Sequence, residues 1–111
     1  MDIRGTGENY FLEERKQANF KRIFPEFEDY DPSYSQSHKP VRQQKTAEGH
    51  AVRAVYMYSA MADVAEEYQD KELMQACVNL WENITQKRMY VTGGIGSSGF
   101  LERFTTDYDL P

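Results

Sequence analysis

The 111-residue sequence predicts an all-α fold: a helical hairpin with a glycine-rich loop at its C-terminal end. Residues 47–68 and 70–87 carry apolar side chains at helical spacing, and the turn between them is short enough to make the two helices antiparallel neighbours. Residues 93–99 then hold four glycines. The length allows one domain. A hairpin of this kind is the repeating unit of helical toroids and solenoids.

The composition excludes several classes of protein. A net charge of −5 and a pI near 5.0 give no basic field for nucleic acid, and no stretch approaches the roughly 18 apolar residues of a membrane span. Cys77 is the single cysteine, so no internal disulfide can form. Met1–Gly5 lacks the apolar run of a signal peptide. We therefore expect a cytoplasmic protein that binds neither nucleic acid nor membrane.

The N-terminal third is expected to be mostly irregular. Residues 10–16 are typical of a helix end running into solvent, and Pro25 and Pro32 interrupt the chain after it. Residues 26–37 are acidic, rich in tyrosine and predicted to be irregular, and Pro40 ends this loop.

The first well-defined helix, residues 47–68, is apolar on nearly every face. A helix of this type is buried on most sides, and 111 residues cannot supply that many neighbours. The pattern therefore indicates partner helices beyond this chain, and it predicts that the chain alone self-associates.

The second helix, residues 70–87, is amphipathic. Asp70 is a good N-cap. One apolar stripe faces the core, and it comprises Leu73, Ala76, Cys77, Leu80 and Ile84. Because free cysteine behaves as a small hydrophobe on such a stripe, a structural role for Cys77 is favoured over a nucleophile or a metal ligand. His38 and His50 are too few to complete a zinc site with it, so no metal site is predicted.

Residues 89–92 form a short β-like run before the glycines, and residues 94–99 match G-x-G-x-x-G. That pattern is the dinucleotide-binding fingerprint when it lies between a strand and a helix in a βαβ unit. The chain before the glycines is helical. Too few residues follow them for the helix that this motif requires and for the acidic residue expected about 20 positions later. A nicotinamide-cofactor protein is therefore a minor alternative, and we expect no thermal shift with nucleotides.

Glu102 is the candidate ionisable group, because it lies between Phe100, Leu101 and Phe104 next to the glycine loop. Apolar surroundings favour the protonated carboxyl that a general acid needs. The alternative is an ordinary loop glutamate paired with Arg103 or Arg88.

His50 is the second candidate. At a helix start the neutral imidazole is favoured, and it can both donate to and accept from a sugar hydroxyl. The alternative is a histidine that hydrogen-bonds the helix end, and the residues alone do not separate the two.

Five motifs resemble those of glycoside hydrolase family 127, the bacterial β-L-arabinofuranosidases and their relatives. The resemblance covers roughly residues 8–111, and the motifs follow one another in fixed order: Tyr34-Ser-Gln-Ser-His-Lys-Pro-Val41, Gly49-His-Ala-Val-Arg-Ala54, Leu80-Trp-Glu-Asn-Ile-Thr85, Met89-Tyr-Val-Thr-Gly-Gly-Ile-Gly-Ser97 and Phe104-Thr-Thr-Asp-Tyr-Asp-Leu-Pro111.

The resemblance implies that residues 1–111 form part of one (α/α)6-barrel catalytic domain, followed by β-sandwich domains in longer chains. It implies a retaining exo-glycosidase that acts on β-L-arabinofuranosides or related sugars. Such an enzyme uses a zinc-bound cysteine nucleophile and a glutamate general acid/base. Glu102 matches the acid/base, and His50 matches a histidine that contacts the sugar.

The same resemblance places the zinc-binding glutamate and cysteine just after the Asp-Tyr-Asp-Leu-Pro motif, where this chain ends. Zinc is therefore expected in a full-length parent, with no cofactor in this segment, and the segment alone is expected to be inactive. The alternative is a stand-alone helical interaction module without catalysis.

Overall fold

The computed structural model describes residues 2, 4–6 and 31–111. Two helices, α3 (Ala51–Glu67) and α4 (Lys71–Asn83), form a hairpin, with short helical turns at η1 (Pro32–Ser35), η2 (Val41–Gln43) and η3 (Ile84–Arg88). Within these residues the only β contacts are isolated bridges. The all-α prediction is therefore confirmed, whereas the helix end expected at residues 10–16 lies outside the described residues.

The helix α3 begins four residues later than predicted, because the backbone before it cannot be helical. Gly49 has φ +79°, and a Cβ built there would lie 2.2 Å from the carbonyl oxygen of Ser33. Only glycine accommodates both conditions. His50 is then extended and caps the helix, and Ala51 is the first helical residue.

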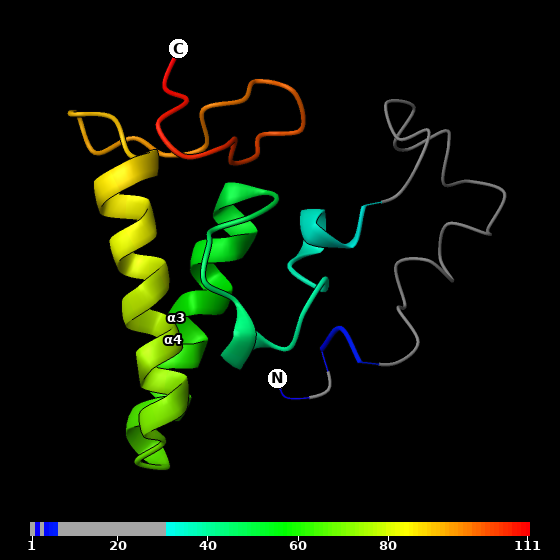
Figure 1. The fold of residues 1–111 in the computed structure, drawn as a ribbon, viewed down its shortest axis with the longest axis vertical. Helices are drawn as coiled ribbons and strands as arrows, with labels where there is room; N and C mark the ends of the chain where they lie inside the picture. Colours follow the sequence, from blue (N-terminus) through cyan, green and yellow to red (C-terminus); the bar gives the residue numbers. More distant parts are fainter. Residues whose placement is uncertain (1, 3, 7–30) are drawn as a thin grey trace, which may run out of the picture.

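Within the described chain α3 is not buried on most sides, because the partner helices that its apolar pattern predicts are not among the described residues. Its buried residues are confined to one face, comprising Ala51, Ala54, Met61 and Ala65. On other faces Val52 is 56% exposed and Tyr56 is 74% exposed. In the described chain α4 packs against one side of α3 and the loop of η1 and η2 lies on another (Figure 1). Several apolar side chains on the remaining sides of α3 are therefore exposed to solvent.

The helix α4 begins as predicted, with the Asp70 carboxylate accepting a hydrogen bond from the Leu73 backbone N–H at 3.0 Å. It ends at Asn83 rather than near residue 87, and the chain continues as a π-helical turn, η3. Gln69 makes the tight turn before α4 with φ +53°.

Two apolar clusters hold these elements together. One joins η2 to the middle of the hairpin and comprises Val41, Met61, Ala65, Leu73, Ala76 and Leu80. The other lies where α3 begins and comprises Ala47, Ala51, Ala54, Ile84 and Phe104. Cys77 packs against the first cluster as expected, and burial raises the pKa of its thiol.

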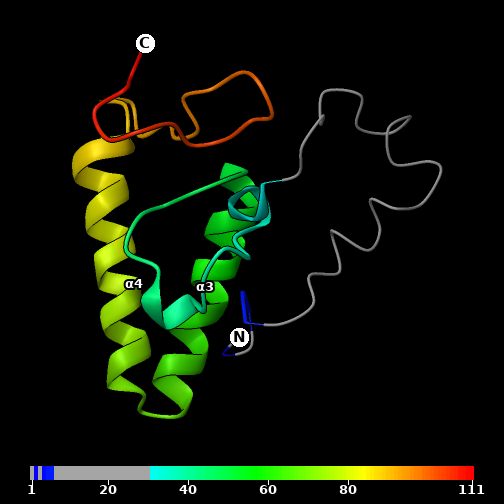
Figure 2. The same cartoon turned by 45° about the vertical axis from the view of Figure 1, so that its right-hand side comes forward.

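The C-terminal segment, residues 89–111, crosses the end of the hairpin where α3 begins and α4 ends (Figures 1 and 2). The β-like run expected at residues 89–92 makes only one bridge, from Met89 to Ile95. Hydrogen bonds from Tyr90 N to Gly94 O (2.9 Å) and from Gly93 N to Tyr90 O (2.8 Å) turn the chain back before a strand can extend. No helix follows Gly99 in the described chain, so the dinucleotide fingerprint lacks its context.

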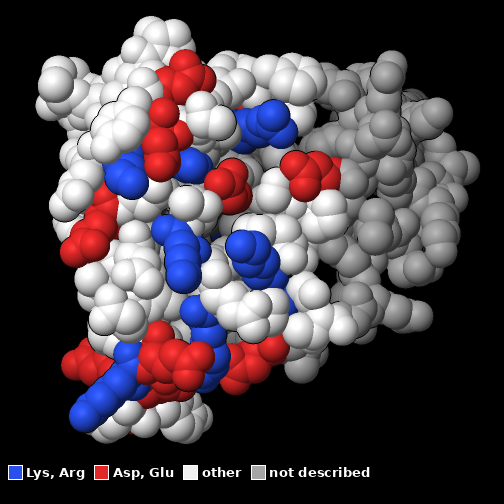
Figure 3. All heavy atoms as spheres, viewed as in Figure 1, with Lys and Arg blue, Asp and Glu red and all other residues white. Residues whose placement is uncertain are grey.

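Acidic and basic side chains are interspersed over the face shown in Figure 3. Among the described residues, Arg42 pairs with Asp2 at 2.6 Å and with Asp70 at 2.5 Å. This face therefore presents no field of a single sign. None of the described helices is both long and apolar enough to cross a membrane.

Candidate functional site

The site is assembled where the C-terminal segment meets the start of α3. The Ala51 backbone N–H donates to the Glu102 carbonyl at 3.0 Å, and the Phe104 N–H donates to the Gly49 carbonyl at 2.9 Å. The first bond satisfies one of the N–H groups that a helix N-terminus leaves unpaired. Two residues far apart in sequence, His50 and Glu102, are thereby held side by side.

His50 uses both of its ring nitrogens. Nδ1 accepts a hydrogen bond from the Arg53 backbone N–H at 3.2 Å, which makes His50 the N-cap of α3. Nε2 lies 3.3 Å from Oε2 of Glu102. The ring therefore caps the helix, as one reading of the sequence proposed, and at the same time faces the candidate acid.

The ring of Tyr34 and the side-chain amide of Gln36 hold His50 in place. The Tyr34 ring meets the imidazole edge to face, with 6.0 Å between ring centroids. The amide of Gln36 donates to the carbonyls of Tyr34 (3.2 Å), Glu48 (3.0 Å) and His50 (3.3 Å). Gln36 is 1% exposed. Sequence reasoning missed this residue, because nothing in its spacing shows that three carbonyls converge on it.

Glu102 is exposed in the described chain, although its neighbours Phe100, Leu101 and Phe104 are apolar. Its side chain is 80% exposed, and the neighbouring Phe100 is 55% exposed. Leu101 and Glu102 have φ of +62° and +49°, so two consecutive non-glycine residues adopt the left-handed conformation. That turn directs Phe100 and Glu102 outward, whereas only Phe104 enters the core.

Leu101 and Glu102 share an energetically costly left-handed backbone conformation. A non-glycine residue in this conformation costs of order 1–3 kcal/mol, and such residues cluster at functional sites. At Leu101 and Glu102 the hydrogen bonds to the start of α3 hold the strained backbone in place.

The alternative pairing of Glu102 with Arg103 or Arg88 does not occur in the described contacts. Arg88 is instead 7% exposed and contacts Asp107 at 2.8 Å and Glu48 at 3.3 Å. Asn83 joins the same cluster by donating to Asp107 at 2.9 Å and accepting from the Ala47 N–H at 2.9 Å. These interactions anchor the C-terminal segment to η3 and to the loop before α3.

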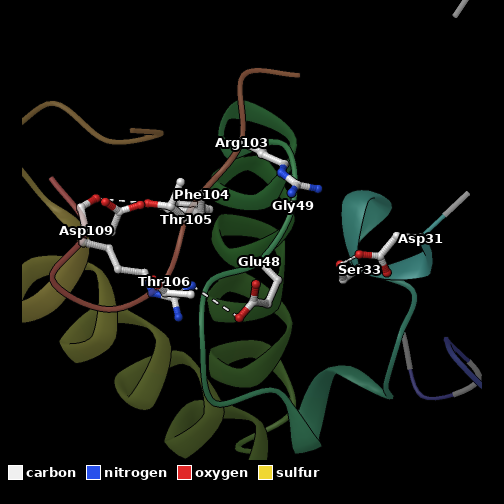
Figure 4. Close-up of a pocket in the computed structure, with 10 residues that line it drawn as sticks. Asp31, Ser33, Glu48, Gly49, Arg103, Phe104, Thr105, Thr106 and Asp109 are labelled. Carbon is white, nitrogen blue, oxygen red and sulfur yellow. Dashed lines mark hydrogen bonds and ion pairs between the residues drawn. The ribbon is translucent and has the colours of Figure 1, made fainter. Parts of the chain in front are cut away.

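A polar pocket of about 340 Å³ lies beside the site, between η1 and the C-terminal segment (Figure 4). Its lining residues are Asp31, Ser33, Glu48, Gly49, Arg88, Arg103, Phe104, Thr105, Thr106 and Asp109. Neither Glu102 nor His50 lines it. Within this pocket Glu48 Oε1 lies 3.3 Å from Arg88 Nη1, so these two charges are already engaged with one another.

No metal site can be assembled from the residues that the structure describes. They contain no group of three or more histidine, cysteine, aspartate or glutamate side chains positioned to hold an ion. Cys77 is packed in the hairpin and lies in none of the contacts around Glu102. The residues present do not fit a zinc centre, so no ligand is assigned.

Comparison with known proteins finds relatives along the whole chain. Residues 3–111 match the family model described as β-L-arabinofuranosidase, GH127 catalytic domain. A non-reducing end β-L-arabinofuranosidase of Bifidobacterium longum subsp. longum is 42% identical over 111 residues, which are 100% of this chain and 17% of that protein.

Solved structures agree with this match. A GH127 β-L-arabinofuranosidase from Geobacillus stearothermophilus T6 superimposes with a TM-score of 0.83 at 50% identity, covering 99% of this chain and 17% of that one. A second GH127 β-arabinofuranosidase gives a TM-score of 0.70 at 44% identity, covering 98% and 17%. The chain thus spans about a sixth of the length of these relatives, and it belongs to the GH127 β-L-arabinofuranosidase family, within the catalytic domain.

Proposed function

We propose that this chain is part of a longer retaining exo-glycosidase, called here the parent enzyme, which acts on β-L-arabinofuranosides or related sugars. Glu102 is its general acid/base, and His50 lies where a sugar hydroxyl can reach it. The observation that carries the proposal is the pairing of Glu102 with His50 at 3.3 Å on a strained, well-anchored turn, in a chain whose relatives are named for this activity.

In this proposal Glu102 has two successive roles. As a carboxylic acid it protonates the departing glycosidic oxygen, and as a carboxylate it activates the water that cleaves the covalent sugar intermediate. Its exposure in this chain leaves it free to reach a substrate. The low-polarity surroundings that would keep it protonated must then come from parts of the parent enzyme that cover it.

We expect the nucleophile and the zinc ligands among residues outside this chain, because the described residues offer no set of side chains that could hold the metal. General acid catalysis alone supplies about 10²–10⁴-fold, which is far below what glycoside hydrolysis requires. The 111-residue chain by itself is therefore inactive under this proposal. Zinc-dependent turnover of an aryl β-L-arabinofuranoside by the pure chain would contradict it.

The test of Glu102 is a substitution to Gln in the parent enzyme, compared on two substrates. With a sugar leaving group, the first step should slow by about 10²–10⁴-fold. With a nitrophenolate leaving group the first step needs little proton transfer, so the second step should limit and give a burst. Azide should then restore turnover, because it needs no general base.

The control is Glu82→Gln, which removes an exposed carboxylate from α4 and should change neither rate. Equal slowing of both substrates by Glu102→Gln, with no burst and no azide rescue, would show that Glu102 is structural.

The alternative function, a stand-alone helical interaction module, leads to a second proposal, which is that the isolated chain self-associates. An apolar groove of about 400 Å³ runs along the hairpin, lined by Val55, Tyr58, Ser59, Ala62, Cys77, Val78, Leu80, Trp81 and Ile84. Trp81 is 69% exposed at its edge. Exposed apolar surface of this kind is usually covered by another helix, and a second copy is the cover available to the isolated chain. Sedimentation at ~100 µM should show association, and a monodisperse monomer would contradict it.

A further inference from the structure

We propose that His50 is a positioning residue for Glu102: it holds the carboxylate in the orientation that proton transfer requires. This inference rests on the proposed function, because it assigns His50 a role in the general acid/base step. It goes beyond a sugar contact, and it follows from how the two nitrogens of one ring are used.

The cap fixes the tautomer of the ring. Nδ1 accepts the Arg53 backbone N–H at 3.2 Å, so Nδ1 carries no proton. A neutral imidazole then has its N–H at Nε2, and Nε2 lies 3.3 Å from Oε2 of Glu102. The helix N-terminus therefore sets which nitrogen donates, and the donor faces the carboxylate.

The backbone holds the two side chains in register. The Ala51 N–H donates to the Glu102 carbonyl at 3.0 Å, and the His50 N–H donates to the Tyr34 carbonyl at 3.1 Å. Tyr34 also meets the imidazole edge to face. The imidazole is thus held by contacts from two elements with its side chain 21% exposed, whereas the Glu102 side chain is 80% exposed.

The distance between the side chains is slightly longer than the 2.7–3.2 Å usual for N–H···O hydrogen bonds. Catalytic hydrogen bonds are often long in the free enzyme and shorten when substrate is bound. A donor held by the helix cap beside an exposed carboxylate that can approach it is the arrangement that such shortening requires.

Binding a sugar hydroxyl and positioning Glu102 would use the same Nε2–H, and the two roles predict different kinetics. If His50 binds the sugar, removing its Nε2–H raises KM for every substrate with the same sugar. If His50 positions Glu102, removing its Nε2–H lowers kcat where proton transfer limits, and it leaves the first step of activated substrates nearly unchanged.

Two substitutions in the parent enzyme separate the cap from the donor. His50→Asn places Oδ1 near the position of Nδ1, so the cap is kept, but the side chain is too short to reach Glu102. His50→Gln places an amide N–H near the position of Nε2, so the donor is kept, but the cap is removed.

For His50→Asn we expect kcat on the substrate with a sugar leaving group to fall by about 10-fold or more, since small misplacements of a catalytic group can cost 10². On the nitrophenyl substrate the first step should stay nearly unchanged. His50→Gln should recover much of this rate although it has no cap.

A double-mutant cycle with Glu102→Gln completes the test. If His50 acts through Glu102, adding His50→Asn to Glu102→Gln should lower the rate on the natural substrate no further. Independent losses that multiply, or a rise in KM alone on both substrates, would overturn the positioning role. Thermal unfolding checks that the variants fold, and His50→Ser, another N-cap without a donor in reach, replaces Asn if that variant does not.

The outcomes for the two proposals are distinguishable. If Glu102→Gln slows both substrates equally, the proposed function fails and the positioning role fails with it. If Glu102→Gln discriminates between the substrates but His50→Asn does not, the acid/base assignment stands and only the role of His50 is overturned.

Discussion

Arg88 and Asp107 are joined by a hydrogen-bonded ion pair, with 2.8 Å between Arg88 Nε and Asp107 Oδ1. Arg88 also donates to the Ala47 carbonyl, and Asn83 donates to the same Asp107 oxygen at 2.9 Å. The pair therefore connects η3, the loop before α3 and the C-terminal segment that carries Glu102. A buried arginine requires such partners, because an unpaired buried charge is strongly destabilising.

Asp107→Asn tests this connection and its dependence on pH. The hydrogen bond from Arg88, aided by that from Asn83, holds the pKa of Asp107 below its ordinary value. A depressed carboxyl pKa contributes stability above its unfolded value of about 3.9 and loses it as the pH falls through the folded pKa. We expect the substitution to lower the free energy of unfolding by about 1–3 kcal/mol at pH 7, and the difference should shrink below about pH 4.

Urea unfolding of the chain at pH 7 and at pH 3 measures both effects. The matched control is Asp109→Asn, which removes an exposed carboxylate from the same segment and should change stability little. A deficit that is the same at both pH values would show that the charge of Asp107 is not the stabilising feature.

Gly49→Ala should be strongly destabilising. The new Cβ would lie 2.2 Å from the Ser33 carbonyl oxygen and 2.5 Å from that of Tyr34, at a backbone with φ +79°. Left-handed strain and overpacking each cost about 1–3 kcal/mol. Gly99→Ala is the control, since nothing lies within 4 Å of its Cβ. Thermal unfolding should show a large loss for the first and little change for the second, and similar melting temperatures would contradict the account of the α3 start.

Asp70 links the hairpin turn to the loop of η2. Hydrogen bonds from Arg42, followed by that from the Leu73 N–H, lower the pKa of Asp70 to about 2. Asp70→Asn keeps an N-cap and weakens the contact with Arg42, whereas Asp70→Ala removes both. At pH 7 the melting temperature should be highest for the wild type, lower for Asp70→Asn and lowest for Asp70→Ala.

The sign of the pH effect at Asp70 follows from the depressed pKa. The advantage of the wild type over Asn is present above about pH 4 and is lost as the pH falls to about 2. Melting curves of the wild type and Asp70→Asn, recorded above about pH 4 and again at about pH 2, measure this difference. If Asn and Ala are equally unstable at pH 7, the cap contributes nothing.

The hairpin was predictable because its signals are local. Apolar periodicity and the Asp70 cap gave both helices and the turn between them. The ends were less accurate: α3 starts at Ala51 rather than Ala47 because contact with the distant Ser33 carbonyl forces glycine at position 49. Nothing local to that position reveals the contact.

The site was only partly predictable. His50 and Glu102 could be named, but 52 positions separate them, and their contact depends on backbone pairing that periodicity does not encode. Glu102 is exposed in the described chain because the left-handed backbone at Leu101 and Glu102 turns Phe100 and Glu102 outward, and its burial in a longer protein stays a prediction. Gln36 was missed because a neutral side chain that satisfies buried carbonyls has no sequence signature.

The apolar groove gives a final prediction for the isolated chain. Val78 lies on the groove at 40% exposure, and a charge there would have to be desolvated when a second copy packs against the hairpin. Val78→Glu should therefore abolish self-association while leaving the hairpin folded. Gln75→Glu adds the same charge to an exposed position of α4 that does not line the groove, and it should associate as the wild type does. Sedimentation of the three proteins at equal concentration, with far-UV circular dichroism to confirm helicity, measures the difference. Equal association of Val78→Glu and Gln75→Glu would place the contact between copies elsewhere on the chain.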